Sequence, residues 1–225
     1  MNFVEKLVRV LAPNDCLVCG SEGSILCQAC SMEYIKTPPS RCPHCLKLTI
    51  SSSLCQNSKS AFKLKHIWVS SDYEGVAKSM LQFLKTNGVM EAAEIIAELI
   101  ADTLPYLPPE TIVVPVPTTT QHRRVRGFDH TALIAKKVAA IKGLSYDPLL
   151  GRVDQVRQTG SGRQARLRQI DGKMYTVKPQ YVKGQDFLVV DDVFTTGSTL
   201  REAARALKQA EAKTISAAVF AQKVI

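Results

Sequence analysis

Apolar and polar positions along the second part of the chain switch repeatedly between helical and strand patterns. Apolar residues recur at helical spacing in four segments, which we expect to be helices: 73–87, 91–104, 129–141 and 197–209. Between them run short apolar segments, which we expect to be strands: 67–69, 111–117, 187–191 and 214–220, with 144–149 as a weaker candidate. Uninterrupted apolar strands are typical of parallel sheets covered on both faces. The pattern therefore predicts an α/β fold with a mostly parallel sheet.

The first 62 residues have a different composition. Residues 1–12 carry apolar side chains at helical spacing, and Pro13 should end that helix. Residues 14–62 contain Gly, Ser, Pro and all seven cysteines but few large apolar groups. Such a segment cannot bury enough area to fold alone and needs a cross-link. We therefore divide the chain into an N-terminal segment, 1–62, and an α/β domain, 63–225.

The redox environment decides what the clustered cysteines do. Glu5, Lys6 and Arg9 interrupt the N-terminal apolar positions, which is unlike a signal peptide. The most apolar stretches are also too short to span a bilayer. We therefore expect a cytoplasmic protein without membrane insertion, in which the thiols bind metal rather than form disulfides.

The cysteine spacing is that of a zinc ribbon. Two C-x2-C turns supply four thiolates, and four thiolates leave no open position for chemistry, so we expect a structural zinc ion. Its ligands would be Cys16, Cys19, Cys27 and Cys30. A pairing of Cys16 and Cys19 with Cys42 and Cys45 also remains open.

A second set of cysteines is one ligand short. It consists of Cys42, Cys45 and Cys55, and Ser58 stands where a further C-x2-C turn would place its last cysteine. His44 and His66 are candidate fourth ligands, although a lone histidine is more often solvated or part of a core. We leave open whether this set binds a second zinc ion.

The segment 187–199, FLVVDDVFTTGST, predicts a phosphosugar site. An apolar strand leads to two carboxylates, Asp191 and Asp192, and a Thr-, Gly- and Ser-rich loop then opens a helix. Backbone N–H groups at a helix N-terminus favour an anion such as phosphate. Carboxylates beside that anion suit hydroxyl groups or Mg²⁺. A ribose 5-phosphate meets both requirements, whereas a plain capped helix after an Asp-Asp turn is the alternative reading.

The net charge of +9 is concentrated in one stretch of the chain. Residues 121–173 contain 12 Lys and Arg against 4 Asp and Glu, which gives +8. Arginine binds phosphate groups bidentately, so both a pyrophosphate and a nucleic-acid backbone fit this segment. The candidate contacts are Arg123, Arg124, Arg126, Arg152, Arg157, Arg163, Arg166 and Arg168. Few aromatic residues accompany them, so stacking on single-stranded bases has little support.

Five motifs are spread over essentially the whole chain: the C-x2-C pairs, Tyr73-Glu-Gly75 with Lys85 and Gly88, VPVP at 114–117, RGFD at 126–129, and the segment 187–199. In combination they resemble the ComF (ComFC) family of competence-associated proteins. The segment 187–199 also resembles the phosphoribosyl pyrophosphate (PRPP) signature of type I phosphoribosyltransferases. The chain departs from the family at His130, where glutamine is usual, in the spacing after Thr159, and in the incomplete second cysteine set.

The resemblance implies a type I phosphoribosyltransferase-like fold, with residues 63–110 as the hood over the site. It also implies that Asp191 and Asp192 hold the ribose hydroxyls and are the catalytic residues if the protein is an enzyme. The 5-phosphate would be bound by Thr195, Thr196, Gly197, Ser198 and Thr199, and Arg126 would contact the ligand. Mg²⁺ would be carried largely by pyrophosphate and ribose oxygens.

Three functions are compatible with these features. The first is a ComF-type protein that binds PRPP or a related phosphosugar and handles single-stranded DNA, with other competence proteins, in natural transformation. The second is an active phosphoribosyltransferase on an unidentified base or amine. The third is a regulator that senses PRPP.

Overall fold

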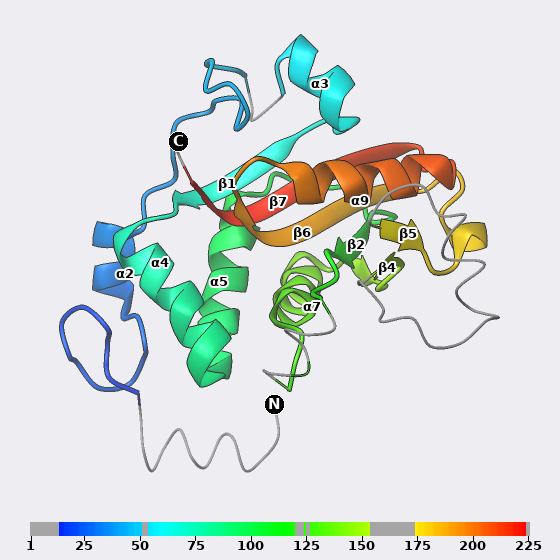
Figure 1. Cartoon of the computed structure of the whole chain (residues 1–225). Helices are drawn as coiled ribbons and strands as arrows, with labels where there is room; N and C mark the ends of the chain where they lie inside the picture. Colours follow the sequence, from blue (N-terminus) through cyan, green and yellow to red (C-terminus); the bar gives the residue numbers. More distant parts are fainter. Residues whose placement is uncertain (1–13, 51–53, 120–123, 125–126, 154–173, 224–225) are drawn as a thin grey trace.

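The computed structural model (Figure 1) describes residues 14–50, 54–119, 124, 127–153 and 174–223. At its centre is a five-stranded sheet in the order β1-β7-β6-β2-β3, in which all neighbouring strands are parallel. The strands are β1 (Ile67–Asp72), β2 (Ile112–Pro115), β3 (Ser145–Tyr146), β6 (Asp186–Phe194) and β7 (Thr214–Gln222). The expected mostly parallel α/β sheet is therefore confirmed.

Helices cover both faces of this sheet, as its apolar strands require. On one face lie α4 (Gly75–Gln82), a π-helical turn η1 (Phe83–Asn87), α5 (Met90–Thr103) and α7 (His130–Lys142). On the other lie α3 (Gln56–Phe62), α9 (Ser198–Gln209) and a small antiparallel pair of β4 (Leu150–Arg152) and β5 (Met174–Thr176). The 3-10 turn η2 (Pro179–Tyr181) precedes β6.

Alternation along β6 distributes its side chains between the two cores. Leu188 and Val190 pack with α5 and α7, whereas Phe187 and Val189 pack with α9. Successive residues of a strand point to opposite faces, so an apolar run is needed when both faces are covered. This is why apolar residues follow one another without interruption in β6 instead of alternating with polar residues.

Three predicted elements differ from the structure. The strand expected at 187–191 continues to Phe194, because β7 pairs with it as far as Gln222, so both aspartates lie inside the strand rather than at its end. The helix expected at 73–87 changes to a π-helical turn at Phe83. The strand candidate at 144–149 contributes only the two residues of β3. The helix expected at 1–12 lies outside the described residues.

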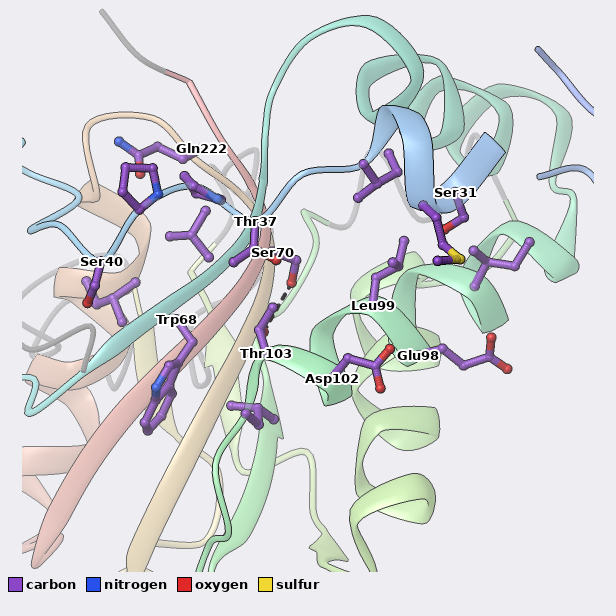
Figure 2. A pocket seen from close by; sticks show the side chains of 18 of the residues that line it. Ser31, Thr37, Ser40, Trp68, Ser70, Glu98, Leu99, Asp102, Thr103 and Gln222 are labelled. Carbon is purple, nitrogen blue, oxygen red and sulfur yellow. Dashed lines mark hydrogen bonds between the residues drawn. The ribbon is translucent and has the colours of Figure 1, made fainter. Parts of the chain in front are cut away.

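The cysteine-rich segment passes from one face of the sheet to the other (Figure 1). Cys16 and Cys30, together with α2 (Gln28–Tyr34), pack in the core that contains α4 and α5. Cys42 packs in the opposite core, with Phe62 of α3. Between them, residues 37–41 run along the edge strand β1, where they line a cavity of about 1230 Å³ with residues 66–70 (Figure 2).

This arrangement rules out the pairing of Cys16 and Cys19 with Cys42 and Cys45, since Cys16 and Cys42 lie in different cores and each pair converges with other cysteines. Residues 63–110, which we expect to form the hood, supply β1, α4 and α5. Within the described ranges, no helix combines the length and the apolar character needed to cross a bilayer.

Candidate functional site

Two aspartates near the end of β6 form the centre of the site. Asp191 is buried, and its Oδ1 accepts a hydrogen bond of 2.9 Å from the backbone N–H of Asp192. Asp192 Oδ1 accepts one of 2.7 Å from Val193 N–H. Asp192 Oδ2 lies 2.9 Å from Nε2 of His130, the first residue of α7, and forms an ion pair with Lys85 of the π-helical turn. Two basic side chains from separate elements therefore converge on one carboxylate.

The two carboxyl groups have opposite electrostatic settings. Burial, together with the neighbouring Asp192 charge, raises the pKa of Asp191 well above its usual value. Burial acts in the same direction on Asp192, but the hydrogen bond with His130 and the charge of Lys85 outweigh it and hold the pKa of Asp192 far below its usual value. Asp192 is thus the member of the pair whose surroundings favour the ionised form.

The pair opens into a cavity of about 270 Å³ at the carboxyl ends of the strands. In an open α/β sheet this edge is where ligands bind. The polar side chains of its lining are Lys85, Thr118, Thr119, His130, Thr131, Arg152, Asp191, Asp192 and Thr199. Cationic, anionic and hydroxyl groups all face one small space, which suits a ligand that carries both hydroxyl groups and phosphate.

The loop from Thr195 to Thr199 begins α9 beside this cavity. Gly197 has a φ of +72°, in the left-handed region that favours glycine, and a Cβ there would lie 2.7 Å from Phe194 Cε2. Ser198 N–H donates to Thr196 Oγ1 at 3.4 Å, which holds the loop in a tight turn. Thr195, Thr196 and Ser198 are exposed. The N-terminus of the twelve-residue helix α9 is therefore open to an anion.

Of the predicted basic contacts, Arg152 at the end of β4 lines the cavity with the two aspartates. Arg124 is exposed. The others lie outside the described residues: Arg123, Arg126, Arg157, Arg163, Arg166 and Arg168.

Sequence reasoning missed the roles of Lys85 and His130, which entered only as parts of a motif and as a departure from one. The signal for His130 is Asp129, whose carboxylate caps α7 by accepting from Ala132 N–H at 3.1 Å. The same carboxylate accepts from the Thr118 hydroxyl at 2.9 Å, which ties the loop after β2 to the start of α7. Because α7 is capped beside the end of β2, its first side chain, His130, lies at the acid pair formed by Asp191 and Asp192.

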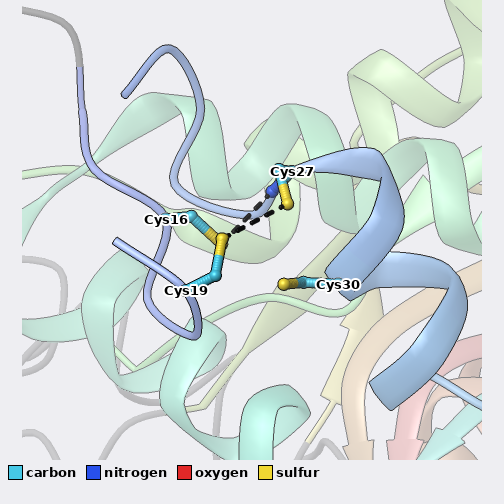
Figure 3. A group of neighbouring side chains, drawn as sticks. All are labelled: Cys16, Cys19, Cys27 and Cys30. Atoms are coloured by element: carbon cyan, nitrogen blue, oxygen red, sulfur yellow. Dashed lines mark hydrogen bonds between the residues drawn. The ribbon is translucent and has the colours of Figure 1, made fainter. Parts of the chain in front are cut away.

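The first cysteine cluster has the geometry of a four-thiolate metal site (Figure 3). The Sγ atoms of Cys16, Cys19, Cys27 and Cys30 all lie within 4.8 Å of one another, and those of Cys19 and Cys27 are 3.7 Å apart. Tetrahedral zinc, with Zn–S bonds of ~2.3 Å, needs sulfurs about 3.8 Å apart. Burial of Cys16 raises the pKa of its thiol, but hydrogen bonds from surrounding backbone N–H groups outweigh burial and lower this pKa to about 6. A lowered pKa favours the thiolate, which is the form that binds metal.

The second cluster contains three thiols and a buried hydroxyl group. Cys42, Cys45 and Cys55 have their Sγ atoms within 4.8 Å of one another. Ser58 Oγ lies 3.2 Å from the Sγ atoms of both Cys42 and Cys55, and 3.4 Å from His44 Nδ1. His66 instead stacks on Trp68. Both clusters could hold a metal ion, and of the two histidines it is His44 that lies beside the second.

Comparison with known proteins agrees with this architecture. Residues 135–224 match the phosphoribosyl transferase domain family. Over 94% of both chains, the sequence is 23% identical to the competence protein ComFC of Streptococcus pneumoniae. The chain is a homologue of the ComFC proteins and contains a phosphoribosyl transferase domain.

Two further comparisons concern a second curated relative of this ComFC homologue and a solved structure. It is 29% identical to the DNA utilization protein YhgH of Salmonella typhi, over 64% of this chain and 66% of the relative. A solved adenine phosphoribosyltransferase of Giardia lamblia, in complex with 9-deazaadenine, shares 17% identity, with a TM-score of 0.39, over 85% of this chain and 82% of that one.

Proposed function

We propose that this ComFC homologue binds PRPP or a related ribose 5-phosphate at the acid pair and handles single-stranded DNA in natural competence. The observation that carries the phosphosugar part is the shared cavity of Asp191, Asp192, Thr199 and Arg152 at the carboxyl edge of the sheet. The aspartates would bind the ribose hydroxyls. The start of α9, from Thr195 to Thr199, would bind the 5-phosphate through its N–H groups and hydroxyls.

Magnesium fits this proposal as a companion of the ligand. Mg²⁺ binds carboxylate oxygens, and the rest of its ligands are usually oxygens of water or of substrate phosphates. Asp191 and Asp192 are the described carboxylates at the cavity, while pyrophosphate and ribose oxygens would complete the coordination shell of Mg²⁺. Lys85 and Arg152 would neutralise further phosphate charge.

The DNA part is supported by the names of the relatives and by the charge pattern. ComFC proteins are named for competence and YhgH for DNA utilization. The +8 segment at 121–173 is the natural candidate for a sequence-independent contact with the DNA backbone. One of its members, Arg152, faces the phosphosugar cavity, so the two anions would be bound near each other.

Calorimetry with PRPP and Mg²⁺, and then with ribose 5-phosphate alone, tests the phosphosugar part. Binding by the wild type and loss of binding in Asp191→Asn with Asp192→Asn are expected. A wild type that ignores both ligands would refute it. Pyrophosphate release in the presence of PRPP would add enzymatic turnover to binding.

Salt titration tests the DNA part separately. The logarithm of the affinity for a single-stranded oligonucleotide should fall linearly with the logarithm of the salt concentration, with a slope of about −0.7 per neutralised phosphate. Reversing Arg163, Arg166 and Arg168 to glutamate should flatten that slope. No binding, or binding without a salt slope, would contradict DNA handling.

A further inference from the structure

A short helix joins the second cysteine cluster to the loop that begins α9. The helix is α3, with Cys55 as its N-cap residue, Ser58 in its first turn and Phe62 as its last residue. Cys55 and Ser58 belong to the cluster, where Cys55 Sγ lies 3.5 Å from Cys45 Sγ. One end of α3 is therefore part of the cluster.

The other end of α3 packs against the loop 195–199. The Phe62 side chain is completely buried, and its ring lies 6.1 Å from that of Phe194. A Cβ added to Gly197 would collide with Phe62 Cε1, so the ring lies directly against the Gly197 backbone. The guanidinium of Arg201, in the first turns of α9, lies over the same ring at 4.9 Å. Phe62 thus contacts residues before, within and after the turn.

A second connection runs through His44. This residue lies between Cys42 and Cys45 in the sequence, and its ring meets the Phe62 ring edge-on at 5.2 Å. A metal ion bound to both cysteines would fix the turn that carries His44. The Phe62 ring would then be held from two sides, by α3 and by His44.

We propose that Phe62 is a positioning residue for the loop 195–199, and that a thiophilic cation such as Zn²⁺, held by Cys42, Cys45 and Cys55, keeps it in place. The donor set fits such an ion, with the Ser58 hydroxyl or His44 available for a fourth position. Only the identity of the ligand at the loop rests on the proposed function; the mechanical link does not.

This link distinguishes the two clusters. The first cluster packs with α4 and α5 on the opposite face of the sheet, whereas the second packs with the residues that support the loop. Loss of metal from the second cluster should therefore loosen the loop, and loss from the first should leave it unchanged.

The test compares Cys45→Ser with Cys19→Ser in the full-length chain. Each change removes one exposed thiol from one cluster, so the two are matched. Both should lower the zinc content by about one ion per chain. Hydrogen exchange of the backbone amides at 195–199 should become about tenfold faster in Cys45→Ser and stay unchanged in Cys19→Ser. Equal exchange in both variants would overturn the proposal, as would a wild type with no metal on the second cluster.

Phe62→Leu isolates the contact itself, and Phe187→Leu is its control. Both residues are buried phenylalanines in the same core, but Phe187 lies at the opposite end of β6 from the loop. Phe62→Leu should keep both metal ions yet speed exchange at 195–199, whereas Phe187→Leu should not. The same exchange rate in both would overturn the positioning role, even if Cys45→Ser fails to fold.

Ligand affinity separates this inference from the proposed function. The dissociation constant for ribose 5-phosphate should rise about 10- to 100-fold in Cys45→Ser and Phe62→Leu. If the wild type does not bind ribose 5-phosphate but the exchange effects appear, the proposed function fails and the positioning role stands. If the wild type binds and neither variant changes exchange or affinity, the positioning role fails alone.

Discussion

Lys85 and Asp192 form an ion pair across two elements that are far apart in the sequence. Lys85 comes from the π-helical turn after α4, and Asp192 from the end of β6. The lysine is only a quarter exposed and the aspartate less, so the pair is largely shielded from water. The pair connects the Tyr73-to-Gly88 motif with the segment 187–199, which the sequence shows only as separate segments.

Replacing Lys85 by methionine should weaken ligand binding. The change keeps the length and apolar stem of the side chain but removes the cation that faces the cavity. The affinity for PRPP with Mg²⁺ should fall by about tenfold or more, as expected for a lost charged hydrogen bond. Lys137→Met is the matched control, because Lys137 forms a similarly exposed pair with Glu94, 2.8 Å apart, outside the cavity lining. Equal affinities in both variants would contradict a role for Lys85 in binding.

The two aspartates should respond in opposite ways to replacement by asparagine. Asp192→Asn leaves Lys85 and His130 without their carboxylate, and should lower the free energy of unfolding by about 3 kcal/mol. Asp191→Asn removes a carboxyl group that burial disfavours in its charged form, and should be neutral or stabilising by about 1 kcal/mol at pH 7. Urea unfolding measures both, and a larger loss for Asp191→Asn would contradict this assignment.

The pH dependence of stability should identify Asp192. Because its folded-state pKa lies below the unfolded value, ionised Asp192 stabilises the fold above the unfolded pKa of ~3.9. That stability is lost as pH falls below this value through the folded pKa. The difference in melting temperature between wild type and Asp192→Asn should therefore be constant from about pH 5 to 7 and shrink below about pH 4. A difference that grows towards acid pH would show that another group is responsible.

The fold could be predicted from the sequence because it depends on local patterns. The apolar run at 187–191 lies within the longer strand β6, and the helical spacing at 91–104 coincides with α5 to within one residue at each end. The sequence also singled out Asp191, Asp192 and Thr199, which lie in one motif and line the cavity. Lys85 could not be found in this way, because a π-helical turn and an ion pair between distant elements leave no periodic signal.

The path of the cysteine-rich segment around the sheet could not be predicted from the sequence either. Spacing alone left Cys42 free to join Cys16, and only the three-dimensional path around β1 places them in different cores. The contact of Phe62 with Gly197 also depends on this path. Glycine in a phosphate-type loop is expected on conformational grounds, but the aromatic ring beneath it comes from a segment that the sequence assigns to another domain.

Removal of metal from the first cluster should unfold the N-terminal part before the sheet. Cys27→Ser should lower the zinc content by about one ion per chain, because it takes one of four converging thiols. Residues 16–34 should then become sensitive to protease, while the amides of β6 and β7 keep their slow exchange. Less than about one zinc ion per wild-type chain, or uniform loss of protection, would contradict a local structural metal.

Gly197→Ala and Gly184→Ala separate the conformational requirement at the loop from its packing. Both glycines have a φ of +72°, but a Cβ at Gly184 would meet no atom within 4 Å, whereas one at Gly197 would strike Phe62 and Phe194. Gly184→Ala should therefore cost only the left-handed backbone penalty, about 1 kcal/mol of unfolding free energy. Gly197→Ala should cost about 2 to 4 kcal/mol, because overpacking adds to that penalty. It should also abolish ribose 5-phosphate binding, since the rings can yield only by moving the loop. Urea unfolding and calorimetry on both variants measure these effects, and equal stability losses would mean that Phe62 does not support the loop.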